Sequence, residues 1–316
     1  MPITRSTLLS GPASATFNGH TFFAHDGILV TPALEISEAT DRVDSDAWGA
    51  LDETVSDALV KIQFTPSAPF ADLLALYPYT QANPGLSLFG STDTPLTLVA
   101  SNGVRLTFAS VAIVQMPDLI LTNRGPVAGA VTFLATGARG LGLTSANRLV
   151  TIDTASVPLP SRRTPQLADD FVITWGAVPW IDLRARAGVH IRFALKTKPV
   201  MSDANAFLDL TLERLEVEAR FTPATPDGPA EIDLISALQL QGANALPGRL
   251  LSMMANTLDV AGDHLFVRLP LAQVTRGSLA FDAVHGRLGE LAFTAGHAWL
   301  GTGAPAPLAT LTEGMP

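Results

Sequence analysis

Alternation of apolar and polar residues, the pattern of a half-buried β-strand, recurs along this chain. It is clearest at 215–221, where four apolar residues alternate with Glu216, Glu218 and Arg220. The segment 59–64 alternates in the same way, and both segments end in Phe-Thr-Pro, where proline cannot continue a strand ladder. The chain is therefore predicted to be mainly β.

Helical spacing is confined to one segment of each half of the sequence. Phe70, Leu73, Leu74 and Tyr77 lie at i, i+3, i+4 and i+7, which predicts a helix over 67–77 with Ser67 as its N-cap. The counterpart is 230–240, with apolar residues spaced by three. Each half is thus expected to carry one flanking α-helix.

A polar, acidic segment at 37–54 separates two predicted strands and is interpreted as a long loop, with a shorter counterpart at 198–209. Asp44-Ser45-Asp46 resembles the opening of a calcium loop, but Trp48 and Val55 stand where such a loop requires oxygen ligands. A partner-contacting loop is the favoured interpretation, because tryptophan is enriched at binding hot spots. The candidate contact residues are Asp41, Asp44, Asp46, Trp48, Asp203 and Phe207.

Further strands follow each helix. The turn Ser101-Asn102-Gly103 predicts a hairpin between strands at 96–100 and 104–115. The other predicted strands lie at 17–23, 27–36, 119–122 and 129–136, then at 170–180, 258–261, 264–274, 279–281 and 289–295.

These elements recur in the same order, which indicates a tandem duplication. Gly27 and Gly188 lie 161 positions apart, and 129–135 matches 289–295 at an offset of 160. The predicted layout is an N-terminal arm (1–15), a first domain (16–138), a linker (139–169), a second domain (170–300) and a C-terminal arm (301–316). Each domain is expected to be a small β-sandwich or barrel.

Composition narrows the functional classes. The 316 residues carry a net charge of −9, which argues against a protein that grips nucleic-acid phosphates. Only 16% of residues are charged, so part of the surface is expected to be covered in an assembly. The absence of cysteine excludes disulfides and Cys-ligated metals. No secretory signal and no apolar run long enough to span a membrane is present.

No catalytic motif emerges. The six histidines show no ligand spacing, and neither a nucleophile elbow nor a phosphate-binding loop occurs. We therefore expect no enzyme activity, no cofactor and no metal.

The first half resembles tail tube proteins of long-tailed bacteriophages. The resemblance is carried by 61–66 (KIQFTP), 74–79 (LALYPY), 91–103 (STDTPLTLVASNG), 114–119 (VQMPDL) and the closing strand 129–135. It implies a β-sandwich with a flanking helix, a long loop and extended arms. The second half shares this resemblance through the internal repeat.

The resemblance implies a virion structural protein, made in the host cytoplasm. Its stacked rings would form a channel that genomic DNA passes without specific binding. Two domains in one chain imply three chains per ring with pseudo-sixfold symmetry. The implied partners are other copies of the chain, the tape measure protein, and the tail terminator and tail tip proteins, with no membrane. Candidate lumen-facing residues are Lys61, Gln63, Glu216 and Glu218.

Three alternatives remain open at this point. The chain could form a single ring at the distal tail or baseplate, or be a tube component of a phage-like injection system. It could also be a soluble β-sandwich module that binds, for instance, carbohydrate. The four tryptophans and two tyrosines form no cluster in the sequence, which disfavours the last.

Overall fold

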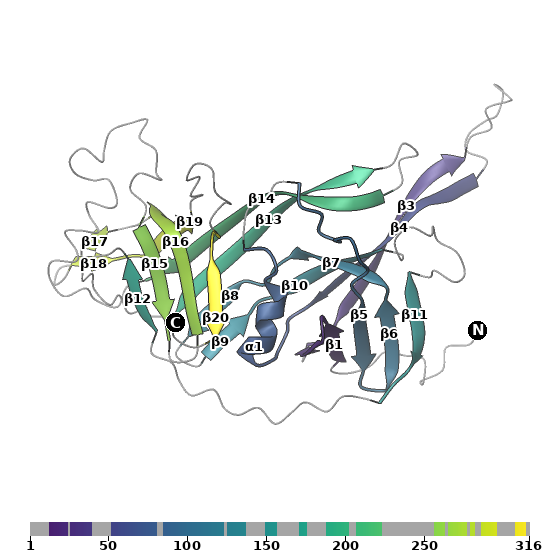
Figure 1. Ribbon diagram of the computed structural model, residues 1–316, viewed down its shortest axis with the longest axis horizontal. Coiled ribbons are helices and arrows are strands. Elements are labelled where there is room, and N and C mark those ends of the chain that lie inside the picture. The colour runs from purple at the N-terminus through teal and green to yellow at the C-terminus, as the bar shows by residue number, and fades with distance from the viewer. Residues whose placement is uncertain are drawn as a thin grey trace, which may run out of the picture.

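In the part of the chain that the structure describes, the protein is mainly β, with antiparallel sheets and one short α-helix (Figure 1). The computed structural model describes residues 13–24, 26–39, 52–80, 85–122, 125–136, 149–156, 171–175, 188–201, 207–222, 256–262, 265–276, 279–281, 286–295 and 307–313. We call 13–156 the first half and 171–313 the second half.

Eleven strands belong to the first half. They are β1 (Ala13–Phe17), β2 (His20–Ala24), β3 (Leu29–Ala39), β4 (Asp52–Phe64), β5 (Leu96–Ala100), β6 (Val104–Phe108), β7 (Ser110–Gln115), β8 (Leu119–Thr122), β9 (Gly125–Ala128), β10 (Val131–Thr136) and β11 (Val150–Thr154). Two sheets form within this half, with strand orders β11-β6-β5-β1-β2 and β3-β4-β10-β7.

Nine strands belong to the second half. They are β12 (Val172–Trp175), β13 (Val189–Met201), β14 (Phe207–Phe221), β15 (Asn256–Ala261), β16 (Leu265–Arg276), β17 (Leu279–Phe281), β18 (Gly286–Leu288), β19 (Leu291–Ala295) and β20 (Thr310–Glu313). One large sheet has the order β12-β15-β16-β19-β14-β13-β8-β9, with β20 also paired to β16. The strands β17 and β18 form a separate pair.

Equivalent strands occur in the same order in the sheets of the two halves. The second half reads β12-β15-β16-β19-β14-β13. The first half reads β1-β5-β6 in one sheet and β7-β10-β4-β3 in the other, and only Ala109 separates β6 from β7. Where the second half uses the single strand β16, the first half therefore uses two strands in succession.

Irregularities of pairing recur too. The β3–β4 register shifts between Glu35 and Ile36, and the β13–β14 register shifts between Lys196 and Thr197, 161 positions later in each case. The pairing of β10 with β7 skips Val114, and that of β19 with β16 skips Thr275. Such bulges bend a strand and increase its twist locally.

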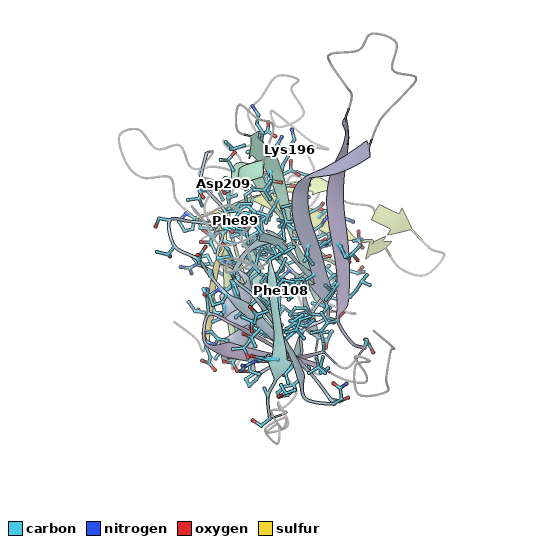
Figure 2. The ribbon with its side chains drawn as sticks, turned by 90° about the vertical axis from the view of Figure 1, so that its right-hand side faces the viewer. Phe89, Phe108, Lys196 and Asp209 are labelled. Atoms are coloured by element: carbon cyan, nitrogen blue, oxygen red, sulfur yellow. The ribbon has the colours of Figure 1, made fainter. Side chains whose placement is uncertain are left out.

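The buried apolar side chains of both halves form one contiguous core. In the first half, Phe133 stacks on Phe64 with ring centroids 5.9 Å apart, and Phe17 meets its edge. In the second half, Phe293 stacks on Phe221 at 5.4 Å and meets Trp175 edge to face. Figure 2 shows Phe108, another buried ring, among the packed side chains.

The helix is shorter than predicted. The α-helix α1 covers only Phe70–Leu73, and a 3-10 turn follows over Leu74–Leu76. Ser67 does not cap it: its backbone instead pairs with that of Phe23 by two hydrogen bonds. His20 Nδ1 lies 2.8 Å from a carboxylate oxygen of Asp72, which ties α1 to β2. The counterpart at 230–240 lies outside the described residues.

Strand limits also differ from those predicted at the ends of each half. The range 1–15, predicted as an arm, includes the start of β1, which forms a hairpin with β2 through Asn18 and Gly19 at positive φ. The range 139–169 includes β11, which pairs with β6, and 301–316 includes β20, which pairs with β16. The described parts of these ranges are therefore built into the sheets.

The polar segment 37–54 is partly strand. β3 extends to Ala39 and β4 begins at Asp52, so the two strands form a long hairpin around residues 40–51. The counterpart at 198–209 is likewise largely strand, in β13 and β14. Both hairpins extend toward the upper right in Figure 1.

Candidate assembly interface

The two halves are joined by a strand pair. β8 from the first half pairs antiparallel with β13 from the second, and β9 lies outside β8 as the end strand of the large sheet. The register places Leu121 opposite Val189, Ile120 opposite His190 and Leu119 opposite Ile191. We call this pairing the junction. Four of its apolar members are fully buried, namely Leu119, Leu121, Val189 and Ile191, whereas Ile120 is partly buried.

Gly188 marks the closest backbone approach at the junction. Its φ is +92°, and a Cβ built there would lie 2.3 Å from the carbonyl oxygen of Leu121. No side chain fits that space, and glycine alone adopts this φ without strain. The glycine therefore allows β8 to seat on β13.

A second contact between the halves lies along the β13–β14 hairpin. The amide of Leu88 donates to the carbonyl of Leu210, and the amide of Leu212 donates to the carbonyl of Leu86, both at 2.8 Å. Figure 2 labels Phe89 and Asp209 close together here. Asp209 pairs with Val200 near the end of the hairpin, and Lys196 pairs with Arg214 farther from that end. Tyr77 packs its ring on Phe193, with centroids 5.1 Å apart. The halves thus associate through backbone pairing, backed by aromatic packing.

The hydroxyl of Tyr77 is buried in this contact and has no hydrogen-bond partner among the described residues. Burial, with the nearby Asp118 carboxylate, raises the pKa of Tyr77. Tyr79 differs, because its hydroxyl donates to the carbonyl of Leu88 at 3.3 Å. Burial and the charge of Asp209 raise the pKa of Tyr79 to about 12.

We expect Tyr77→Phe to stabilise the protein by about 1 kcal/mol, since it removes a buried polar group that nothing satisfies. The matched variant Tyr79→Phe removes a hydrogen bond and should cost about 1 kcal/mol. Equilibrium unfolding in urea measures both. Equal losses from the two variants would contradict this assignment.

A groove of about 610 Å³ opens beside the junction, between the end of β7 and the outer face of β13. Its lining combines polar and apolar residues: Gln115, Asp118, His190, Arg192 and Arg220, with Val114, Phe193, Ala194 and Leu195. The guanidinium of Arg220 donates to Glu218 at 2.8 Å, and this hydrogen bond raises the pKa of Arg220. The mixture of carboxylate and guanidinium groups is typical of a polar contact surface, whereas small-molecule pockets are mostly apolar.

The predicted lumen-facing residues lie on the solvent side of β4 and β14. Lys61 and Glu216 are exposed, and Gln63 and Glu218 are partly exposed, opposite buried neighbours in each strand. The face is not uniformly acidic, because Glu216 pairs with Arg214 and Glu218 with Arg220. Exposed pairs of this kind contribute little stability, and here they make the surface mixed in sign.

Most of the residues predicted to make loop contacts lie in segments that the structure does not describe. Asp41, Asp44, Asp46, Trp48 and Asp203 lie outside the described residues. Phe207 is the first residue of β14 and pairs with Met201. The sequence reasoning missed the junction, whose local signal was only Gly188 and the strand at 119–122.

Other kinds of site find no support in the part of the chain that the structure describes. No group of three or more His, Asp or Glu residues there could hold a metal ion. No helix there is long and apolar enough to cross a membrane. Comparison of the chain with protein-family models and with curated proteins found no match.

Proposed function

We propose that this chain is a structural subunit, a tandem duplication of one β-unit, that assembles into stacked rings forming a phage tail tube. The observation that carries the proposal is the recurrence of one strand order, with bulges at equivalent positions, in both halves. Two like units joined head to tail inside one chain can repeat the same contact between chains, and such contacts form a ring when the rotation between units closes.

The pairing registers support equivalence residue by residue. Phe64 opposite Val131 corresponds to Phe221 opposite Leu291, and Ile62 opposite Phe133 corresponds to Ala219 opposite Phe293. The stacked aromatic pairs occupy these same positions. Independent β-units would have no reason to share register, bulges and ring stacking together.

The equivalence extends beyond the repeat found in the sequence. β11 pairs with β6 as β20 pairs with β16, so Thr154 opposite Val104 corresponds to Glu313 opposite Leu265. β1 pairs with β5 as β12 pairs with β15, so Phe17 opposite Leu96 corresponds to Trp175 opposite Leu258. We infer that the duplicated units are 13–154 and 172–313, with 155–171 as the connection.

A ring of three chains then has six similar units around its axis. Closure of the sheets around a channel would cover strand edges that otherwise promote aggregation. We propose that the solvent side of β4 and β14 faces this channel. Its mixed charge fits passage of DNA without capture, since capture requires an excess of basic groups. The role is structural and not enzymatic, and the protein resides in the virion tail.

In such a tube the long hairpins β3–β4 and β13–β14 would contact the next ring at the ends where β3 is joined to β4 and β13 to β14. The partners implied by this function are further copies of the chain, the tape measure protein along the channel, and the terminator and tip proteins at the two ends.

Negative-stain electron microscopy of the purified protein, with its mass in solution measured alongside, tests the proposal. We expect stacked rings or hollow tubes with three chains per ring. Single rings that never stack would favour the distal tail ring. A protein that stays monomeric at high concentration would contradict ring formation and favour the binding module.

A further inference from the structure

One hairpin in each half corresponds to the other, yet only one of them has joined a larger sheet. In the first half, Leu119 of β8 lies opposite Ala128 of β9. In the second half, Leu279 of β17 lies opposite Leu288 of β18, 160 positions later in both strands. β8 pairs with β13 at the junction, whereas within the described residues β17 and β18 pair only with each other.

The edge that would receive this second hairpin is also open. β13 corresponds to β3, because His190 lies opposite Arg220 of β14 as Leu29 lies opposite Gln63 of β4. Within the described part of the chain, β3 pairs with β4 alone and its outer edge has no strand beside it. An unpaired edge of this kind is a template for another strand.

Apolar residues are less buried along the edge of β3 than along the edge of β13, as expected if β3 lacks a neighbouring strand. Val189 and Ile191 are fully buried beneath the junction. Their equivalents in the first half, Ile28 and Val30, are only partly buried. Leu29 between them is 62% exposed; its equivalent His190 is exposed at the junction as well, but Leu29 is apolar. An exposed leucine flanked by half-buried apolar residues on an open edge is a surface suited to a partner strand.

The glycines at the start of these two edges show the same difference. Gly27 and Gly188 have nearly the same positive φ, +86° and +92°. A Cβ at Gly188 would strike the Leu121 carbonyl, but a Cβ at Gly27 would meet nothing within 4 Å. The first half keeps the conformation that admits a close backbone, and among the described residues no backbone lies within 4 Å of that place.

In Figure 1, β17 and β18 lie at the left, and the long β3–β4 hairpin extends to the upper right. Within the described residues, β17 and β18 pair with no strand of the first half. A second copy of the chain can present its β3 edge to this hairpin.

We propose that β17 of one chain adds antiparallel to β3 of a second copy, repeating the junction between chains. The register of the junction transfers to Phe281 opposite Ile28, Ala280 opposite Leu29 and Leu279 opposite Val30. We call this contact the seam. The seam rests on the proposed function only in that its contacts would close into a ring. A head-to-tail contact forms either a ring or an open filament, depending on the angle between successive chains.

Engineered cysteines test the seam directly, since the native chain contains none. Chains carrying Leu29→Cys are mixed with chains carrying Ala280→Cys under mild oxidation. Residues opposite one another in an antiparallel pair have Cα atoms about 4.5–5.5 Å apart, which suits a disulfide. The internal control is His190→Cys with Ile120→Cys in one chain, the same register position at the junction.

We expect the Leu29→Cys and Ala280→Cys chains to form a covalent dimer at least about tenfold faster than a mismatched pair, because pairing holds the thiols at near-millimolar effective concentration. Ile152→Cys, on β11 and 67% exposed, replaces Leu29→Cys in the mismatched pair. Both substitutions in one chain should give a covalent ladder whose largest closed product counts the chains per ring.

Rings or tubes that form without this crosslink would overturn the seam and leave the tube function standing. A monomer without crosslinks would overturn both. Hydrogen exchange tests the seam in the unsubstituted protein. Amides at 28–31 and 279–281 should gain protection on assembly, whereas amides at 189–191 should be protected already in the unassembled chain. Unchanged exchange at 28–31 in assembled protein would also overturn the seam.

Discussion

Gly188→Ala is expected to unfold the junction at a cost that its counterpart Gly27→Ala does not incur. Both glycines have positive φ, so alanine at either costs about 1–2 kcal/mol of backbone strain. Only at Gly188 does the new Cβ also meet a carbonyl, at 2.3 Å. Relieving such an overlap adds about 1–3 kcal/mol, because β8 must move away from β13.

Urea unfolding of the two variants measures the difference. We expect Gly188→Ala to lose at least about 1 kcal/mol more than Gly27→Ala in the free energy of unfolding, from that overlap alone. Assembly through the seam should show the opposite order of effects. Gly27→Ala should fold but assemble poorly, because the backbone of Phe281 from a second copy would lie where the backbone of Leu121 lies at the junction. Equal losses in unfolding would contradict the close approach at Gly188.

Phe133→Ala and Phe293→Ala should each destabilise the protein by about 3–5 kcal/mol, the usual cost of emptying a buried phenylalanine site. Both rings are fully buried, and each contacts two further aromatic rings. Because the two halves share one core, each substitution should lower the midpoint of a single unfolding transition.

Calorimetry with circular dichroism checks this expectation. Leu134→Ala, on the same strand as Phe133 but only partly buried, is the matched control and should cost far less. Two separate transitions, with each phenylalanine variant moving only one of them, would show that the halves unfold independently and would contradict the shared core.

Alternation in the sequence identified the strands whose two faces have different surroundings. Leu215–Phe221 and Leu59–Phe64 lie within β14 and β4, and apart from the partly buried Leu59 their apolar residues are buried. The start of β4, at 52–58, is rich in polar residues and lacks that contrast. The start of β14 does alternate, with Leu210 and Leu212 buried, but the acidic segment before it favoured a loop up to Asp209. A polar stretch was therefore interpreted as loop.

Other differences have equally local causes. The Asn18-Gly19 turn is a strong hairpin signal that was overlooked within the predicted strand 17–23. Pro69 and Pro78 bracket the helical segment, and α1 covers only four residues of the predicted eleven. The turn at 101–103 was predicted correctly, with Gly103 at positive φ and its amide donating to the Ala100 carbonyl.

The junction could not be predicted from local pattern. The strand at 119–122 was expected, but nothing in its four residues says that it pairs with β13 of the other half. Sheet membership depends on which edge is free once every other strand is placed, and that is a property of the whole fold. The same reasoning explains why β17 was predicted as a strand without its partner.

The covalent connection between the halves has a consequence for how a ring would assemble and where it would break. At the junction, β8 and β13 meet at a concentration fixed by the chain itself, so half of the contacts in a ring form during folding regardless of dilution. Only the remaining contacts respond to protein concentration. The two kinds of contact are also free to diverge in sequence, as His190 and Leu29 already have. A strained ring would then part at alternate positions, always between chains.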